Sequence, residues 1–335
     1  MAEYPGGTMV LSIDLELAWG SFDTIPVETL NAEAAAERKQ IKRLLVLMDQ
    51  YKIPATWAVV GHLMLKGCRR DSDGNAHAEI HPHARYSWFP HDWYVYDPCV
   101  DASKAPAWYA SDIVEWIRET RTHHEIASHS FAHICYGDPE CSSAAVLADL
   151  GAAMKVGSER GLALTSLVFP RNQVGYLELL RRVGLRAYRG VDPPHILSGS
   201  NVVLRKAVTA LDALFGFIPT SVQADEVLPG LWNIPGSHCY LAHKGIYRLV
   251  PILSRVAKSR SGIKRAIMKG ELYHLWFHPR DLIANPDLAF RCLEKIFSYA
   301  HGLREKGLLR ILTMDEYARR LEIDKAKGGG MLVES

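Results

Sequence analysis

The sequence predicts an α/β fold in which parallel strands form a barrel. Short apolar segments with strand character alternate with amphipathic helical segments from residue 9 to residue 322. About seven such strand–helix units follow one another, which is the pattern of parallel barrels. The 335 residues are enough to bury the core of one large domain. We expect a single domain over residues 1–324, with a long insertion at residues 66–111 and a flexible tail at residues 325–335.

The first three elements predict a βαβ unit. Residues 9–15 form a nearly continuous apolar run, as expected of a buried strand. Residues 29–51 predict a long helix, because their apolar side chains recur with helical spacing. A second apolar run at residues 55–60, between Pro54 and Gly61, predicts the next strand.

The alternation continues to the end of the chain, starting with a short strand at residues 125–127. Helices are predicted at residues 142–157, 174–183, 256–269, 286–303 and 314–322, and strands at 164–169, 185–188, 272–277 and 308–312. Residues 190–235 mix proline and glycine with apolar runs, and the order of their elements is not predicted.

Composition excludes several classes of function. The chain has 39 basic and 37 acidic side chains, a formal charge of +2, so no charge excess favours nucleic acid or an anionic membrane. No apolar run is long enough to span a bilayer, and the N-terminal residues lack the positive charge of a secretion signal. The six cysteines form no CxxC pair. We therefore expect free thiols and a cytoplasmic location.

Two histidines predict a metal site. His129 and His133 lie four residues apart, directly after the strand at residues 125–127. Four residues make about one helical turn, so both imidazoles could bind one metal ion. An HxxxH spacing alone is a weak signal, and surface histidines at a helix N-terminus are the alternative.

Two acidic residues could complete this site. Asp14 and Glu16 are two residues apart at the end of the first strand, so their side chains share a face. In parallel barrels this end of the strands holds the active site. Two histidines and one carboxylate leave coordination positions open, as catalytic metals require. The alternative is a strand end that enters solvent, although burial of Asp14 without a partner would be costly.

Two further residues are candidates for catalysis. His278 follows the strand at residues 272–277 and could donate or accept a proton near neutral pH, or simply cap the strand before a proline. Arg171 follows the strand at residues 164–169. It could keep Asp14 ionised, because a nearby cation lowers the pKa of a carboxyl group, or it could be an ordinary surface arginine.

Substrate contacts are expected from Trp19, Asn172, Trp276 and the insertion. The insertion is rich in Trp and Tyr, which argues against disorder in a loop of this length. Its aromatic side chains could stack on sugar rings or cover apolar surface, and the sequence favours neither. The spacing of its histidines follows no ligand pattern, so we expect solvent exposure for His77, His81, His83 and His91.

Four motifs resemble those of the polysaccharide deacetylase family, the NodB-homology carbohydrate esterases, and occur in the same order. They are IDLE at residues 13–16, HSFAH at 129–133, FPRN at 169–172 and LWFH at 275–278. The resemblance runs from residue 9 to residue 321. It implies a distorted (β/α)7 barrel that removes N-acetyl or O-acetyl groups from sugars with a divalent metal: zinc, or else cobalt or nickel.

Two motifs depart from the family pattern. The family often has adjacent aspartates in its first motif, whereas here Leu15 separates Asp14 from Glu16. The arginine motif is usually R-x-P followed by an aromatic residue, whereas here Pro170 precedes Arg171. The first departure leaves open which acid binds the metal, and the second puts the role of Arg171 in doubt.

The resemblance implies a role for each motif residue. Asp14 is the base, His278 protonates the leaving amine and Arg171 holds Asp14. The metal ligands are Glu16, His129 and His133. The acceptor is expected to be a small-molecule, nucleotide-linked or lipid-linked N-acetyl sugar, and a homo-oligomer is left open. A glycoside hydrolase that uses both acids, or an inactive sugar-binding barrel, is the alternative.

Overall fold

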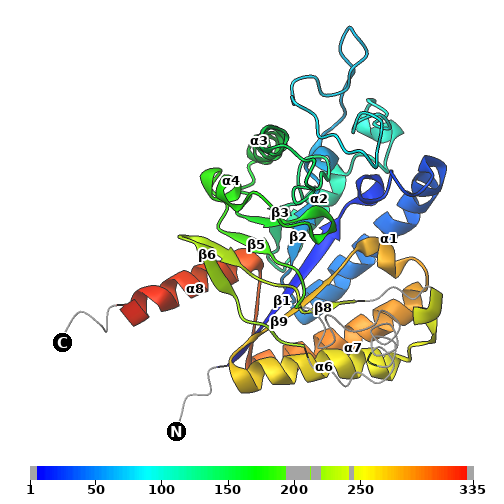
Figure 1. Ribbon diagram of the computed structural model, residues 1–335. Coiled ribbons are helices and arrows are strands. Elements are labelled where there is room, and N and C mark those ends of the chain that lie inside the picture. The colour runs from blue at the N-terminus through cyan, green and yellow to red at the C-terminus, as the bar shows by residue number, and fades with distance from the viewer. Residues whose placement is uncertain (1–5, 194–211, 213–219, 241–244, 330–335) are drawn as a thin grey trace, which may run out of the picture.

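A curled, mostly parallel sheet forms the centre of the protein, as shown by the computed structural model (Figure 1), which describes residues 6–193, 212, 220–240 and 245–329. Its strands are β1 Gly7–Leu15, β2 Thr56–Val59, β3 Glu125–Ser128, β4 Ser166–Val168, β5 Ala187–Arg189, β6 Asp225–Leu228, β7 Leu231–Asn233, β8 His238–Cys239, β9 Leu272–Phe277 and β10 Leu309–Leu312.

The strand order matches the predicted parallel barrel, with one departure. Along the sheet the order is β6-β7-β5-β4-β3-β2-β1-β9-β8, and β10 pairs with the beginning of β1. All neighbours pair in parallel except β6 and β7, which form a hairpin through a Pro229-Gly230 turn. Gly230 has φ +79°, the left-handed conformation that such a turn requires. Within the described residues the path begins at β6 and ends at β8, so the barrel is open there.

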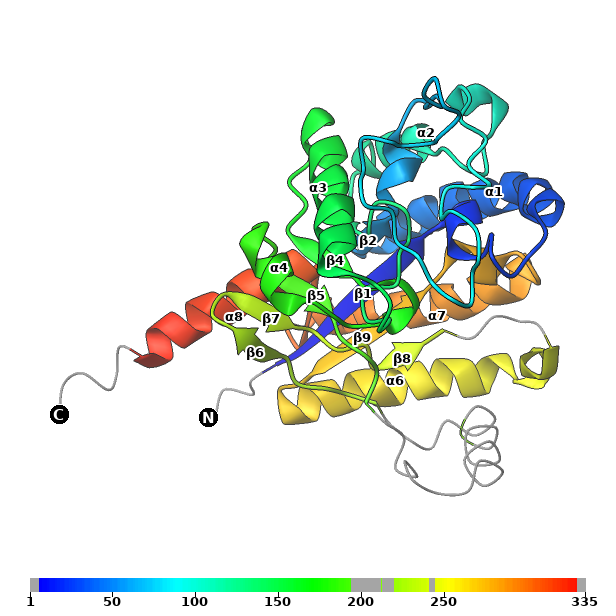
Figure 2. The ribbon, with the colours of Figure 1, turned by 45° about the horizontal axis from the view of Figure 1, so that its top comes forward.

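Helices cover the outside of the sheet. They are α1 Val27–Tyr51, α2 Ser111–Arg118, α3 Ser143–Glu159, α4 Leu177–Arg182, α6 Ile252–Lys269, α7 Pro286–Glu305 and α8 Met314–Gly329. Helices α6 and α7 lie side by side next to β1 and β9, while α3 and α4 lie by β3–β5 (Figure 2). Short 3-10 turns follow four strands at their carboxyl ends: η1 Leu17–Gly20, η2 Gly61–Met64, η4 Pro170–Asn172 and η6 Pro279–Leu282.

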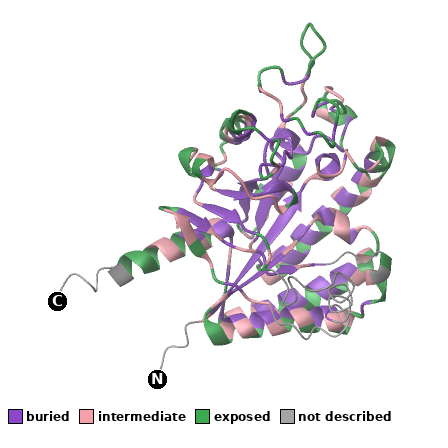
Figure 3. Ribbon diagram, in the orientation of Figure 1, coloured by how far each residue is buried: buried purple, intermediate pink, exposed green. Residues whose placement is uncertain are grey.

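The central strands are buried on both faces (Figure 3), which explains their nearly continuous apolar sequences. In β1, the residues from Met9 to Leu15 at odd positions pack in the large outer core with the helices. Val10 belongs instead to a smaller cluster, which includes Met314 and Ala318 from the start of α8. Because side chains alternate along a strand, Asp14 shares the inner face with Val10.

The predicted helices and strands are confirmed, with ends displaced by a few residues. Helix α2 and the β6–β7 hairpin were not predicted, and part of the unassigned segment 190–235 lies outside the described residues. Helix α8 extends to Gly329, into the segment predicted to be a flexible tail, and residues 330–335 lie outside the description. Among the described helices, none combines the length and apolar character needed to cross a bilayer.

Candidate metal centre and active site

The carboxyl ends of the strands surround a pocket of about 410 Å³. Asp14 lies at the end of β1, and Glu16 follows it at the start of η1. The other polar side chains around the pocket are Ser21, Glu37, His133, Arg171, Asn172, Arg189, Trp276, His278, Arg280 and Asp281. Predicted catalytic and metal-ligating residues therefore meet at the end of the barrel where parallel strands place active sites.

Glu16 brings the two predicted histidine ligands together. Its Oε1 atom lies 3.0 Å from His129 Nε2 and 3.0 Å from His133 Nε2. Both histidines are almost fully buried, and their ring centroids are 5.0 Å apart. A carboxylate oxygen and two imidazole nitrogens thus converge on one point.

The donor set fits a divalent cation. His129 Nδ1 donates a hydrogen bond to the carbonyl oxygen of Val168 at 2.8 Å, so in the tautomer with a single proton on Nδ1 the lone pair of Nε2 points at Glu16. Such a bond from the outer nitrogen is the usual support of a metal-binding histidine. A lone pair facing a carboxylate oxygen at 3.0 Å is repulsive unless a proton or a cation lies between them. Zinc and similar ions accept these ligands.

The histidine pair is not carried by a helix, which corrects the predicted geometry. Residues 129–133 form an irregular loop after β3, and Ser130 and His133 have φ of +66° and +59°. Both conformations are left-handed, which is uncommon for residues other than glycine. The irregular backbone of this loop, and not the spacing of a helix, brings the two imidazole rings together.

Asp149 of α3 holds this loop, and sequence analysis missed it. Its carboxylate accepts hydrogen bonds from Ser130 Oγ at 2.8 Å, from the amide nitrogens of Phe131 and Ala132, and from the hydroxyl of Tyr136 at 2.6 Å. Asp149 is buried. An acidic residue in the middle of an apolar helix face was the only signal in the sequence that could have revealed it.

Gly20 makes room for the Glu16 carboxylate. A Cβ atom on Gly20 would lie 1.8 Å from Glu16 Oε2. The glycine at the end of η1 therefore lets the chain turn closely around the acid that it has just passed. Any larger residue would have to displace this carboxylate from its place beside the histidines.

Arg189, not Arg171, is the partner of Asp14. The guanidinium of Arg189 donates from Nη1 and Nη2 to the two oxygens of Asp14, each at 2.7 Å, and both side chains are buried. Arg171 instead donates to Asp23 at 2.5 Å and lies over the Trp88 ring. The two arginines differ in backbone position. Arg171 lies in the η4 turn with a left-handed backbone (φ +54°), whereas Arg189 is the last residue of strand β5.

Neighbouring groups fix Arg189. Its Nη1 also donates to Ser12 Oγ at 3.0 Å, and Ser12 is 2.8 Å from His274 Nε2. Burial alone raises the pKa of Asp14, but the positive charge of Arg189 offsets it, and the pKa of this carboxyl lies below its usual range. Asp14 is therefore an ionised, oriented carboxylate.

His278 is placed next to both acids. Its Nε2 lies 3.5 Å from Glu16 Oε1 and 3.7 Å from Asp14 Oδ2, while Nδ1 lies 3.2 Å from Asp281 Oδ2. Burial lowers the pKa of His278, but the charges of Glu16, Asp281 and Asp14 raise it well above its usual range. The ring can therefore carry a proton at neutral pH at the edge of the pocket.

Two of the three predicted substrate contacts line the pocket. Asn172 and Trp276 do so, and Arg189 lies over the Trp276 ring at 4.4 Å from its centroid. Trp19 does not: it is buried and packs edge-on against Phe22 and Trp108. Trp19 therefore anchors η1 in the core.

The aromatic side chains of the insertion pack into the large hydrophobic core. Among its aromatic residues, Trp93, Tyr94, Trp108 and Tyr109 are buried, and no residue of the insertion lines the pocket described above. These four rings cover apolar surface. His77 is buried as well, beside Asp97, so the predicted exposure of this histidine is wrong.

No family model matches the sequence, and no curated protein sequence is detectably similar to it. Solved structures resemble its fold. A Mycobacterium smegmatis protein described as a polysaccharide deacetylase has a TM-score of 0.62 at 14% identity, covering 97% of this chain and 93% of the other. A Pseudomonas aeruginosa protein with the same description has a TM-score of 0.57 at 10% identity, covering 93% and 89%.

A third similar structure has a different description. The 4-alpha-glucanotransferase of Thermococcus litoralis has a TM-score of 0.52 at 11% identity, covering 93% of this chain and 40% of the other. At these identities the similarity shows the fold alone. The chain has the fold of polysaccharide deacetylases, and the choice between chemistries depends on the site.

Proposed function

We propose that the chain is a metal-dependent carbohydrate deacetylase of the NodB-homology type. The observation that carries the proposal is the convergence of Glu16, His129 and His133 on one point, next to an ionised aspartate and a histidine. Two imidazoles and one carboxylate leave coordination positions for water and substrate. When bound there, a divalent metal such as zinc supplies an acidified water and positive charge opposite a developing oxyanion.

The chain's own residues supply the remaining chemistry. Asp14 is ionised and oriented by Arg189, so it can accept a proton from water in the pocket. His278 can carry a proton and faces the same space, so it can protonate the leaving amine of an acetamide. Asn172 and Trp276 are placed to contact the sugar.

The contacts favour Glu16 as the metal ligand and Asp14 as the base. Glu16 lies against both histidines, whereas both oxygens of Asp14 accept hydrogen bonds from Arg189. An oxygen already paired with a guanidinium is a poorer ligand for a cation.

A glycoside hydrolase on a similar barrel is the second candidate, since the fold also occurs in a glucanotransferase. Glycosidases need two carboxyl groups at least about 5 Å apart, on opposite sides of the bond. Here ligand oxygens of Asp14 and Glu16 lie within 4.8 Å, and Arg189 clamps Asp14. This alternative also leaves the histidine pair without a role.

The first experiment is the metal content of the purified protein, measured by mass spectrometry beside a His129→Ala/His133→Ala variant. We expect zinc, cobalt or nickel at the Glu16 site, and loss of that metal in the variant. Retention of the same metal content by a folded variant would refute the site. Acetate release from N-acetyl sugars would then support the deacetylase, whereas release of reducing sugar would favour the glycoside hydrolase.

A further inference from the structure

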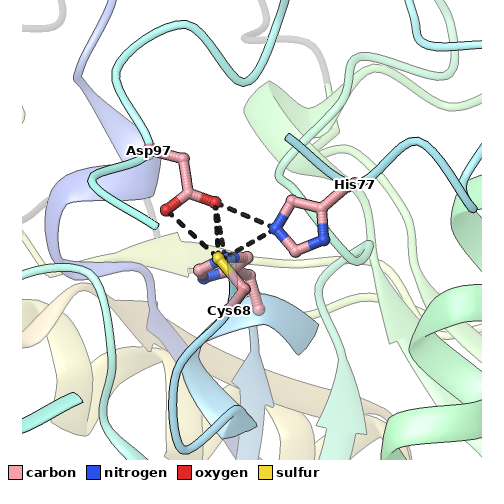
Figure 4. Close-up of side chains that lie close together, drawn as sticks. Cys68, His77 and Asp97 are labelled. Carbon is pink, nitrogen blue, oxygen red and sulfur yellow. Dashed lines mark hydrogen bonds and ion pairs between the residues drawn. The ribbon is translucent and has the colours of Figure 1, made fainter. Parts of the chain in front are cut away.

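A second cluster of metal-ligand side chains lies where the insertion meets the barrel (Figure 4). His62 belongs to η2, directly after β2, whereas Cys68, His77 and Asp97 belong to the insertion. One ligand atom from each of the four residues lies within 4.8 Å of all the others. We propose that these four side chains form a structural zinc site that fastens the insertion to the barrel.

The distances fit tetrahedral coordination. Asp97 Oδ2 lies 2.8 Å from His62 Nε2, 2.9 Å from His77 Nε2 and 3.4 Å from Cys68 Sγ. The two Nε2 atoms are 3.1 Å apart, and Cys68 Sγ is 3.9 Å from His62 Nε2. With Zn–N near 2.0 Å and Zn–S near 2.3 Å, tetrahedral ligands stand about 3.3–3.6 Å from one another. The observed separations bracket that range.

Both imidazoles direct a lone pair toward the centre of the cluster. His62 Nδ1 donates to the carbonyl oxygen of Trp108 at 3.2 Å, and His77 Nδ1 donates to Glu79 Oε1 at 3.3 Å. In the neutral tautomer each Nε2 is then an acceptor. Two such nitrogens and a carboxylate oxygen within 3.1 Å of one another repel unless a proton or a cation lies among them. Outer hydrogen bonds of this kind orient the histidine ligands of metal sites.

The second oxygen of Asp97 is satisfied by other partners. Oδ1 accepts a hydrogen bond from the amide nitrogen of Cys99 at 3.0 Å and from the hydroxyl of Tyr109 at 3.2 Å. Arg70 also donates to the main-chain oxygen of Asp97 at 2.8 Å. Oδ1 therefore holds the carboxylate in place, and Oδ2 lies nearest the two imidazole nitrogens; Cys68 Sγ is 3.7 Å from Oδ1 and 3.4 Å from Oδ2. This is the arrangement of a carboxylate ligand with outer support.

Burial and charge also favour a bound dication. His62, His77 and Asp97 are at most 4% exposed, and Cys68 is half-buried. Zinc with two neutral imidazoles, one carboxylate and one thiolate is neutral overall, which suits a site removed from water. Four protein ligands leave no position for substrate, so the site is closed in the manner of structural zinc. A cavity of about 550 Å³ is lined by Cys68 and His77, and a metal ion can reach the cluster through it.

The cluster lies against the loop of the first site. The amide nitrogens of Gly61 and His62 donate to the carbonyl oxygens of Ser130 and Phe131, at 2.9 and 2.8 Å. Fastening η2 and the insertion together therefore also supports the loop that carries His133. The ligands of the two sites are distinct, so each can be tested alone.

Cobalt substitution separates the two sites, because only the second contains sulfur. We expect the Co²⁺-loaded wild-type protein to show a thiolate-to-cobalt charge-transfer absorption. The His129→Ala/His133→Ala variant should keep this absorption while losing one metal equivalent. Cys68→Ser should lose it, and Cys99→Ser, a matched control thiol beside Asp97, should keep it.

The number of metal ions bound per chain is a second measurement, and it does not require the Cys68→Ser variant to fold. We expect about two zinc ions per wild-type chain and about one in the His129→Ala/His133→Ala variant. Absence of the sulfur-dependent absorption from folded, cobalt-loaded wild-type protein would overturn the proposal. So would an absorption that Cys99→Ser abolishes and Cys68→Ser preserves. If the first site fails to bind metal while the absorption is present, the proposed function fails and this inference stands.

Discussion

At the scale of single residues, two acids that lie two positions apart at the end of β1 have different surroundings and therefore different chemistry. Asp14 is fixed by a buried arginine, and Glu16 lies between two histidines. Burial raises the pKa of Glu16, but the charges of His278 and His133 bring it well below its usual range. Both acids are thus ionised, one as a candidate base held by Arg189 and one as a candidate ligand.

Replacing Arg189 should impair catalysis more than replacing Arg171. Arg189→Met leaves Asp14 buried without its partner, and breaking a buried pair costs about 3–5 kcal/mol of stability. The pKa of Asp14 should then rise, and kcat/KM should fall by about 100-fold or more, as expected for loss of a general base. Arg171→Ala is the control, because Arg171 contacts Asp23 and not Asp14. Steady-state kinetics with unfolding curves check this, and a larger activity loss in Arg171→Ala would contradict the assignment.

Replacing His278 should lower turnover and leave metal binding intact. His278→Gln removes the proposed acid, and general acid catalysis contributes about 10²- to 10⁴-fold. Because the folded pKa of His278 is raised, its acid form is lost only as pH rises through that pKa, so activity should decline on the alkaline side. Asp281→Asn removes one cause of the raised pKa and should move that decline to lower pH. Rate–pH profiles and metal analysis test this, and loss of metal in His278→Gln would show that His278 is a ligand instead.

At the scale of elements, the site depends on loops that the strands and helices hold in place. The loop after β3 contains two left-handed residues, and helix α3 stabilises it through Asp149. Residues in sparsely populated backbone conformations persist only when their surroundings hold them. The geometry of His133 is therefore set by a helix that follows it in the chain.

Asp149→Asn should weaken metal binding without unfolding α3. The amide replaces one acceptor oxygen by a donor, so part of the loop loses its hydrogen bonds to Asp149. Loss of such outer support costs about 10- to 100-fold in metal affinity. Ser142→Ala is the matched control: it removes the N-cap bond to Ala145 and should cost about 1 kcal/mol of stability while leaving affinity unchanged. Competition with a chromophoric chelator measures both, and equal affinities in the two variants would contradict this role of Asp149.

At the scale of the whole molecule, stability and site chemistry are linked through buried charge. Glu37 of α1 is buried and faces the pocket. Burial, with a smaller contribution from the charge of Glu16, raises its pKa to about 8, against the lowering effect of Arg280. The folded protein therefore retains a proton on Glu37 that the unfolded chain releases near pH 4.5.

The contribution of Glu37 to the stability of the metal-free protein should fall as pH rises through this window. Between pH 4.5 and about 8 the folded state binds one proton more at Glu37, so this contribution to the free energy of unfolding decreases by at most about 1.4 kcal/mol per pH unit. Glu37→Gln should remove this decrease, whereas Glu28→Gln, at an exposed position of the same helix, should not. Denaturant unfolding of chelator-treated protein at several pH values tests this. An unchanged slope in Glu37→Gln would show that Glu37 is ionised in the folded protein.

Much of the fold and part of the site could be predicted because their signals are local. The spacing of apolar residues in strands and helices is visible among neighbours along the chain. The alternation of strands and helices from residue 9 to residue 322 could therefore be predicted. Asp14, Glu16 and the two histidines were chosen as candidates because each lies at, or soon after, the end of a predicted strand. Arg189 also follows one, but an arginine at a strand end has many ordinary uses, and Arg171 beside a motif was the wrong choice.

The sequence by itself determined the class of fold and the residue types available for chemistry, since both depend on spacing along the chain. Only the tertiary structure decided which side chains meet. Arg189 reaches Asp14 across 175 positions, and Asp149 binds Ser130 across 19. His62 and Asp97 come together across 35. Such pairings come from strand order and from the packing of the insertion, and no local pattern specifies either.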